Sequence, residues 1–293
     1  MIPGISIDVI SHMIEQRADE LILPRFGKLR PEDIDTKTHA NDFVTIADTE
    51  TERALREDLT RYIPGCIVIG EEAVSSGAMG VEALADPTKI VFVADPVDGT
   101  YNFKNANPTF GVMLALVHGG ETLAGWIYDV MNNTHYIAVK GQGAFRIQKG
   151  YTGSYQKGER LHVATPKDLN DPQINGFLES MYFPKEMRPF LQQELQGRFR
   201  SLRCSAHEYI QVATGQKDFD VSHHMKPWDH LPGALLVQEA GGIVQKFDGS
   251  PYRPTDESGG LISASHPGLV QELQNKFIQP GLKIVAGMGP PKP

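Results

Sequence analysis

Two short apolar runs in the first hundred residues each end in acidic side chains, and this feature constrains the fold most. Residues 66–69 (CIVI) lead into Glu71 after one glycine, and residues 90–94 (IVFVA) lead directly into Asp95 and, three residues later, Asp98. Runs of this length and composition predict buried strands. Carboxylates cannot gather in a dry site without a counter-charge, because desolvation and mutual repulsion both oppose it.

A third segment places another acid at the start of a buried element. Asp229 follows Trp228 and opens a predicted helix over residues 229–240. Three acidic segments that converge in this way imply a bound cation. Ligand sets made only of oxygen suit Mg²⁺ or Mn²⁺ rather than zinc or copper.

The turn after the second apolar run, residues 95–100, combines acidic side chains with a glycine and a threonine. Asp95 and Asp98 are three residues apart and can flank metal ions about 3.5–4 Å from each other. Gly99 allows a ligand to approach the backbone closely, and Thr100 opens a short predicted helical turn whose N–H groups would receive phosphate. Metal ligands next to an anion-binding turn are what metal-assisted hydrolysis of a phosphate ester requires.

The remaining pattern predicts an antiparallel meander followed by alternating strands and helices, which is typical of layered α/β packing. The predicted helices cover residues 5–23, 45–63, 186–196, 206–215, 229–240 and 267–277. The predicted strands cover residues 66–69, 90–94, 110–117, 122–130, 134–139, 143–147, 173–178, 200–203, 219–222, 243–247 and 261–264. The polar stretch at 28–43 is expected to be irregular.

The polar segment at 148–160 is a plausible domain boundary. We expect an N-terminal α+β domain over residues 1–150 that binds metal and phosphate, and a C-terminal α/β domain over residues 151–286 that completes the metal site and binds the alcohol of the substrate. Three prolines in residues 287–293 predict a flexible tail.

Charge and composition exclude several classes of protein. The 28 basic and 36 acidic residues give a net charge of −8, and the basic residues form no cluster interleaved with aromatics, so binding to nucleic acid or to an anionic membrane is not expected. No apolar run is long enough to span a membrane. The chain has two distant cysteines and no signal-peptide pattern at its start, which predicts a cytoplasmic protein without disulfides.

Four motifs in order resemble the inositol monophosphatase family. Residues 95–103 (DPVDGTYNF) resemble its first signature, and the segment from Trp228-Asp229 to EAGG at 239–242 resembles its second. The GEE at 70–72 and the NDFVT at 41–45, followed by Asp48, match two further family elements. Together they cover residues 5 to 280. The resemblance implies an αβαβα sandwich of the type shared with fructose-1,6-bisphosphatase.

The resemblance also implies a phosphomonoesterase that uses two or three Mg²⁺ ions, with Mn²⁺ as an alternative. Carried over by position, the first ion would be held by Glu71, Asp95 and the Val97 carbonyl, and the second by Asp95, Asp98 and Asp229. A weaker third ion would sit beside Glu71. The family further implies a homodimer and sensitivity to lithium.

The catalytic roles implied by the resemblance belong to neighbouring residues. Thr100, oriented by Asp48, and Glu71 would help to activate the attacking water, and the N–H groups of Gly99 and Thr100 would bind phosphate. From the residues alone, Asp48 is equally a helix cap, since Thr45-x-x-Asp48 forms a capping box. Asp229 can also be read as a cap.

The residues expected to recognise the alcohol of the substrate differ from the family's sequence pattern. Ser222 stands where inositol phosphatases carry an acid that binds substrate hydroxyls, seven residues before Asp229. The family's glycine-threonine-alanine turn is replaced by RCSA at 203–206. We expect Arg203, Ser205 and Ser222 to contact the substrate.

These departures leave the substrate open. Arg203, Lys226 and the histidines at 223–224 would suit a second anionic group, as in fructose 1,6-bisphosphate. Glu208 would suit a polar or cationic alcohol such as histidinol. The main expectation is hydrolysis of a small phosphorylated alcohol or sugar by metal-activated water. The alternative from another class is a catalytically idle regulator that binds phosphate.

Overall fold

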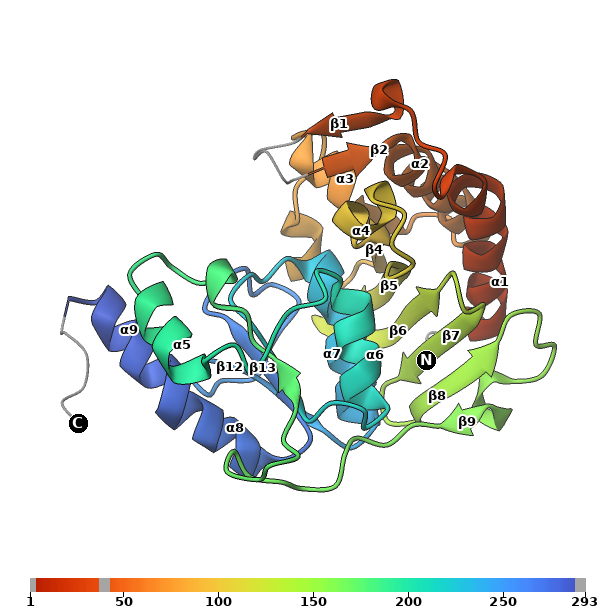
Figure 1. The fold of residues 1–293 in the computed structure, drawn as a ribbon. Coiled ribbons are helices and arrows are strands. Elements are labelled where there is room, and N and C mark those ends of the chain that lie inside the picture. The colour runs from red at the N-terminus through yellow and green to blue at the C-terminus, as the bar shows by residue number, and fades with distance from the viewer. Residues whose placement is uncertain (1–3, 37–42, 288–293) are drawn as a thin grey trace.

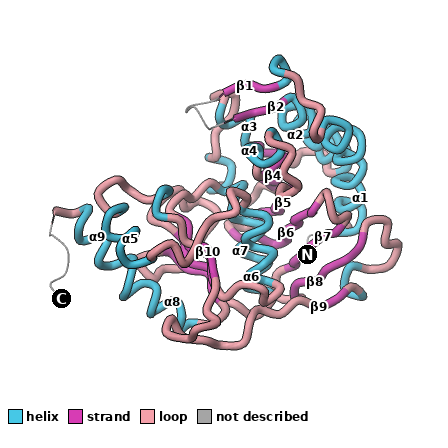
Figure 2. The backbone as a smooth tube through the Cα atoms, viewed as in Figure 1, coloured by secondary structure: helices cyan, strands magenta, loops and turns pink. Residues whose placement is uncertain are grey.

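The protein is built of five stacked layers of helix and sheet (Figure 1). The computed structural model describes residues 4–36 and 43–287. Two helices cover the outer face of a seven-stranded sheet, two more lie between that sheet and a four-stranded one, and three cover the far side (Figure 2). The predicted layered α/β sandwich is therefore confirmed.

The larger sheet has the strand order β3-β4-β5-β6-β7-β8-β9, and only its first pair is parallel. The predicted meander over residues 110–147 is confirmed, because four consecutive strands pair antiparallel with their neighbours. The strands are β3 (Ile67–Gly70), β4 (Val91–Asp98), β5 (Gly111–His118), β6 (Glu121–Asp129), β7 (Thr134–Val139), β8 (Gly143–Gln148) and β9 (Glu159–Arg160).

The outer face of this sheet packs on α1 (Ile7–Arg17) and α2 (Ile46–Tyr62). Apolar residues at helical spacing bury one side of each helix against the sheet. Beyond its last turn α1 continues as a π-helical turn to Ile22, so the helix predicted over 5–23 is confirmed. The strands β3 and β4 end beside α3 (Glu71–Ser75) and α4 (Thr100–Lys104).

The central layer consists of α6 (Ser205–Ala213) and α7 (Pro227–Glu239), which pack against each other and against both sheets. The smaller sheet has the order β10-β11-β13-β12. Its strands are β10 (Gly176–Phe177), β11 (Phe219–Ser222), β12 (Ile243–Lys246) and β13 (Leu261–Ala264). The far layer holds α5 (Arg188–Leu195), α8 (Pro267–Leu273) and α9 (Gln279–Val285), the last two joined by a π-helical turn.

Two local predictions are wrong. Residues 200–203 form no strand, because Arg203 adopts a positive φ of 56° and the carbonyl of Leu202 accepts a hydrogen bond from the Asn102 amide, which holds this stretch as a loop. The stretch at 28–43 is not wholly irregular, since β1 (Ile34–Thr36) and β2 (Phe43–Thr45) pair antiparallel. These strands are short and half exposed, so they lack the apolar run that signals a strand.

The larger sheet continues through β9, beyond residue 150, and the division into two domains near that residue stays a prediction. Residues 288–293 of the tail predicted over 287–293, and the motif positions 41–42, lie outside the described residues. Within the described residues, no helix is both long and apolar enough to cross a membrane.

Candidate active site

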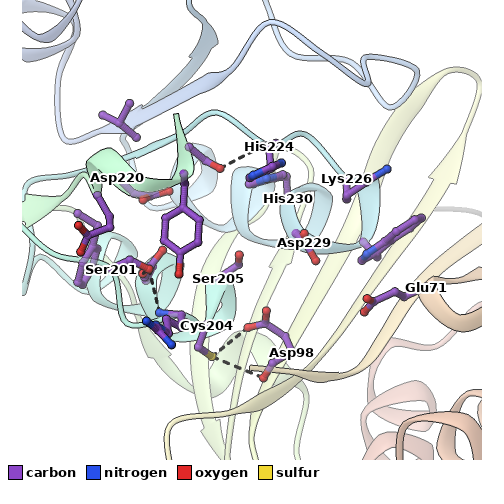
Figure 3. A pocket seen from close by; sticks show the side chains of 18 of the residues that line it. Glu71, Asp98, Ser201, Cys204, Ser205, Asp220, His224, Lys226, Asp229 and His230 are labelled. Atoms are coloured by element: carbon purple, nitrogen blue, oxygen red, sulfur yellow. Dashed lines mark hydrogen bonds between the residues drawn. The ribbon is translucent and has the colours of Figure 1, made fainter. Parts of the chain in front are cut away.

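A cavity of about 600 Å³ opens where the ends of β4 and α3 meet α6, α7 and β11 (Figure 3). At one end it is lined by Glu71, Asp98 and Asp229, and at the other by Ser201 and Asp220. The three residues predicted to contact substrate, namely Arg203, Ser205 and Ser222, all line it as well. The sequence-predicted acids and the predicted alcohol site therefore share one space.

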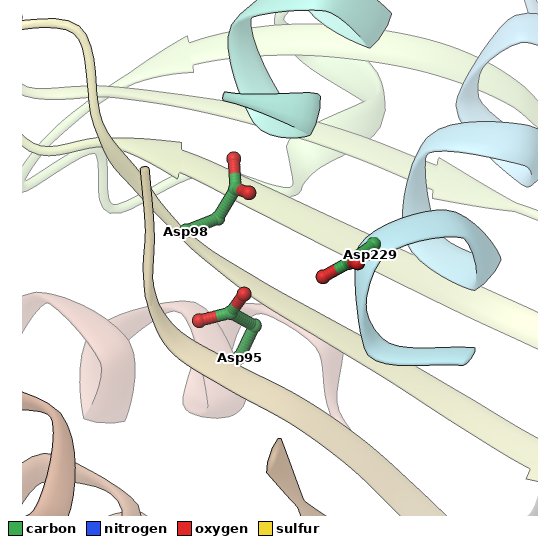
Figure 4. A group of neighbouring side chains, drawn as sticks. All are labelled: Asp95, Asp98 and Asp229. Carbon is green, nitrogen blue, oxygen red and sulfur yellow. The ribbon is translucent and has the colours of Figure 1, made fainter. Parts of the chain in front are cut away.

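Three of the predicted metal ligands converge at one end of this cavity. Asp95 and Asp98 project from the end of β4, and Asp229 projects from the first turn of α7 (Figure 4). One carboxylate oxygen of each lies within 4.8 Å of the others. Asp95 and Asp98 are buried and Asp229 is partly exposed to the cavity. Segments more than a hundred residues apart thus build one acidic group.

The backbone between the two β4 acids explains why both face Asp229. The register of β4 with β5 shifts between Asp95 and Asp98, and the N–H of Val97 donates to Asp95 Oδ1 across 3.0 Å. Gly99 then takes a φ of 89°, and a Cβ there would lie 3.0 Å from the Thr109 carbonyl oxygen. Only glycine fits this turn without strain.

The electrostatics of the acidic group favour a bound cation. Burial, followed by the charges of Glu71, Asp98 and Asp229, raises the pKa of Asp95 well above its ordinary value. Burial also raises the pKa of Asp98, although this carboxylate accepts hydrogen bonds from Cys204 Sγ at 2.9 Å and from the Ala206 N–H at 2.7 Å. Clustered oxygen ligands with this excess of negative charge fit a hard divalent cation such as Mg²⁺.

Asp48 makes contacts that suit both of the roles left open by the sequence. Its Oδ2 accepts from the N–H of Thr45 across 2.8 Å and from the Thr45 hydroxyl, so it caps α2. Its Oδ1 accepts from Thr100 Oγ1 across 3.1 Å. Thr100 Oγ1 also lies 3.0 Å from the Val97 carbonyl oxygen. The cap therefore fixes the carboxylate that orients Thr100.

Glu71 is positioned by a residue that the sequence analysis missed. The buried carboxylate of Glu52 accepts from the N–H of Glu72 at 2.7 Å and from the N–H of Ala73 at 3.2 Å, which caps the first turn of α3. A Cβ on Gly70 would lie 2.2 Å from Glu52 Oε2, so a larger residue there would displace this carboxylate. The sequence signal was an acid in line with the buried Leu55 and Leu59 of α2.

With this geometry established, comparison with known proteins identifies the family. The sequence model of the inositol monophosphatase family matches residues 6–278. The chain belongs to this family. It is 27% identical over 245 residues to an inositol-1-monophosphatase of Bacillus subtilis, covering 84% of this chain and 87% of the relative. It is 34% identical over 262 residues to a Nus factor SuhB of Pasteurella multocida, covering 87% and 90%.

Solved structures of the family share the fold. The inositol monophosphatase II of Staphylococcus aureus superimposes with a TM-score of 0.76 at 23% identity, covering 97% of each chain. An IMPase of Thermotoga maritima superimposes with a TM-score of 0.74 at 24% identity, covering 96% of this chain and 98% of that one. The layered sandwich is thus the inositol monophosphatase fold.

Several site residues of this family member were missed or only partly read from the sequence. Cys204 was not assigned to the site, and it is buried with its thiol donating to Asp98. Glu208 is buried and accepts from Ser201 Oγ at 2.7 Å and from the Leu202 N–H at 2.5 Å. Asp220 lines the cavity from β11 and was not singled out at all.

Proposed function

We propose that the protein is a phosphomonoesterase that hydrolyses a small phosphorylated alcohol or sugar with the help of Mg²⁺. The observation that carries this proposal is the convergence of Asp95, Asp98 and Asp229 at one end of a cavity large enough for a small ester. The shared fold and family support it.

The residues that would hold two or three Mg²⁺ ions, or Mn²⁺, are Glu71, Asp95, the Val97 carbonyl, Asp98 and Asp229. Glu71 lines the cavity beside Asp98 and Asp229, and it acts electrostatically on Asp95. When bound, such ions lower the pKa of water and neutralise charge on the phosphate oxygens. Asp95, Val97 and Asp98 are buried, and Glu71 and Asp229 are partly exposed to the cavity. All five offer oxygen atoms, the ligands that a hard divalent cation prefers.

The chain's own groups would manage the attacking water and the phosphate. Because Thr100 donates its hydroxyl hydrogen to Asp48, the lone pairs of Thr100 Oγ1 are left to accept a hydrogen bond from the attacking water. The N–H groups of Gly99 and Thr100, at the start of α4, would bind the phosphate oxygens. Water adds to phosphorus, the P–O bond to the alcohol breaks, and the alcohol oxygen leaves with a proton. No covalent enzyme intermediate is required.

A second candidate function follows from the relatives named Nus factor. One such relative is 34% identical to this chain, so a role without catalysis is the alternative. The complete set of Glu71, Asp95, Asp98, Thr100 and Asp229 favours catalysis, since an idle protein has no need to retain every acid. From the family resemblance we also propose a homodimer and inhibition by lithium.

The test is phosphate release from a panel of esters with and without Mg²⁺. The panel holds inositol 1-phosphate, fructose 1,6-bisphosphate, histidinol phosphate, adenosine 3′,5′-bisphosphate and glycerol 2-phosphate. Asp95→Asn should lower kcat by about a thousandfold or more, because it removes a charge from the acidic group, and should weaken the rise in Tm that Mg²⁺ causes. Glu186→Gln, at an exposed acid outside the cavity, is the control.

Two results would contradict the assignment. Near-normal turnover in Asp95→Asn would refute the role of this acid in catalysis. Mg²⁺ binding without turnover of any ester would favour the idle regulator. The comparison with Asp95→Asn requires this variant to remain folded, and its thermal unfolding curve in the presence of a chelator reports this directly.

A further inference from the structure

The alternation of side chains along β11 places two polar residues on the cavity side. Phe219 and Val221 pack into the apolar core between the smaller sheet and its outer helices. Because successive residues of a strand face opposite ways, Asp220 and Ser222 share the other face, and both line the cavity. An acid therefore stands two residues from Ser222, one pleat further along the strand.

Asp220 is a buried acid whose charge lacks a partner. Its residue is only 5% exposed, and no side chain in residues 4–36 or 43–287 donates a hydrogen bond to its carboxylate; its one donor is the backbone N–H of Val221. Burial raises the pKa of Asp220 to about 7. Desolvating a carboxylate without a counter-charge is costly, so this position calls for a ligand that supplies one.

A second acid stands close to Asp220. Glu208 of α6 lines the same cavity and is also buried. Its pKa is raised well above its ordinary value, first by burial and then by the charge of Asp220. The donors to Glu208 are a serine hydroxyl and a backbone N–H, both neutral. Without a cation nearby the pair is therefore shifted toward its protonated form, and a bound cation would favour the charged form.

The cationic side chains that line the cavity are engaged elsewhere. The guanidinium of Arg203 lies 4.4 Å from the centre of the Tyr101 ring. The ammonium of Lys226 lies 5.8 Å from the Trp228 ring and toward Glu71, at the end of the cavity opposite Asp220 (Figure 3). Burial lowers the pKa of His230 to about 4, so this neighbour is neutral at pH 7.

We propose that Asp220, supported by Glu208, binds a protonated amine on the alcohol part of the substrate. This inference rests on the proposed function and names its substrate class, which is a phosphorylated amino alcohol. The phosphate would lie beside Asp98 and Asp229, and the ammonium group would reach the opposite end of the cavity. A neutral hydroxyl could hydrogen-bond to the pair but would not favour its charged form, whereas an ammonium group would do both.

The experiment compares two series of esters that differ only at the far end. ω-Aminoalkyl phosphates and ω-hydroxyalkyl phosphates of increasing chain length are assayed with Mg²⁺, and the ratio of their kcat/KM values is measured at each length. The ratio at the best length should favour the amine by roughly ten- to hundredfold, the range expected for a charged hydrogen bond. Asp220→Asn, which keeps the shape and removes the charge, should lower this ratio by about the same factor.

The design separates this inference from the function on which it rests. Glu186→Gln removes an equal charge outside the cavity and should leave the ratio unchanged. If the unmodified protein turns over the amino and the hydroxy esters with equal kcat/KM values, the inference is overturned, whereas the proposed phosphatase activity is still supported. An unchanged ratio in Asp220→Asn also overturns the inference. Absence of Mg²⁺-dependent turnover on every ester overturns both. The first comparison needs no variant, so it stands even where Asp220→Asn does not fold.

Discussion

Replacing Asp220 by asparagine should make the protein more stable above neutral pH. Asp220 is buried beside a second acid, and its pKa rises from 3.8 to about 7 mainly because burial removes its hydration. The folded state therefore holds a proton on this group over a pH range in which the unfolded chain has lost it. Asparagine fills the same volume and does not titrate.

The magnitude follows from the size of the rise. Below pH 3.8 the carboxyl is protonated in both states, so its full contribution to stability is present. As the pH rises toward 7 the unfolded chain gains stability relative to the folded one by about 1.4 kcal/mol for each pH unit. The difference between Asp220→Asn and the unmodified protein should thus be about 2 kcal/mol at pH 5 and about 4 kcal/mol at pH 8.

The assay is urea unfolding at pH 5 and pH 8 in a buffer that contains a chelator, so that no metal ion contributes. The variant's advantage should grow between the two pH values, whereas Glu186→Gln should track the unmodified protein at both. A variant that is equally stable or less stable at pH 8 would refute the reasoning, because it would mean that the Asp220 carboxylate is adequately compensated in the folded protein.

Two further substitutions test the alcohol site and the support of Glu71. Ser222→Glu should raise activity on inositol 1-phosphate relative to glycerol 2-phosphate, because the family places an acid here; an unchanged ratio of kcat/KM values would show that this position does not face the alcohol. Gly70→Ala should destabilise the protein by about 1–3 kcal/mol in urea unfolding, because its Cβ would collide with the Glu52 carboxylate. The loss should shrink in a Glu52→Ala background, and equal losses in both backgrounds would exclude this clash as the cause.

The acidic half of the site could be predicted because its signals are local. Asp95 and Asp98 directly follow an apolar run, and Asp229 opens a helix, so each acid is tied to an element that the pattern reveals. Asp48 carried two interpretations in the sequence. In the structure one of its oxygens caps α2 and the other accepts a hydrogen bond from Thr100, and its part in catalysis stays a prediction. Local sequence patterns were therefore enough to select these four acids.

The rest of the site depends on contacts between distant segments. Cys204 and Ala206 donate to Asp98 across more than a hundred residues of sequence, and no periodicity indicates this. The strand predicted at 200–203 is a loop because Asn102 holds its carbonyls and Glu208 accepts from the Leu202 N–H. Tertiary hydrogen bonds override local preference here. Asp220 went unnoticed since a single acid in a short strand resembles an edge residue until the cavity beside it is known.

Each end of the cavity brings acidic side chains together with little access to water. The two ends differ in the kind of positive charge that would compensate these acids. At one end three acids stand with the oxygen geometry of a metal site. At the other, the donors to Asp220 and Glu208 within residues 4–36 and 43–287 are neutral, and no third acid of the described residues joins them in a metal-binding group. The raised pKa of Asp220 implies a loss of stability of about 4 kcal/mol at pH 8, and groups that reduce stability in this way are typical of functional sites. If metal ions resolve the first end and bind phosphate, a positive charge on the substrate itself is the simplest resolution of the second. The cavity would then be complementary to a molecule that carries opposite charges at its two ends.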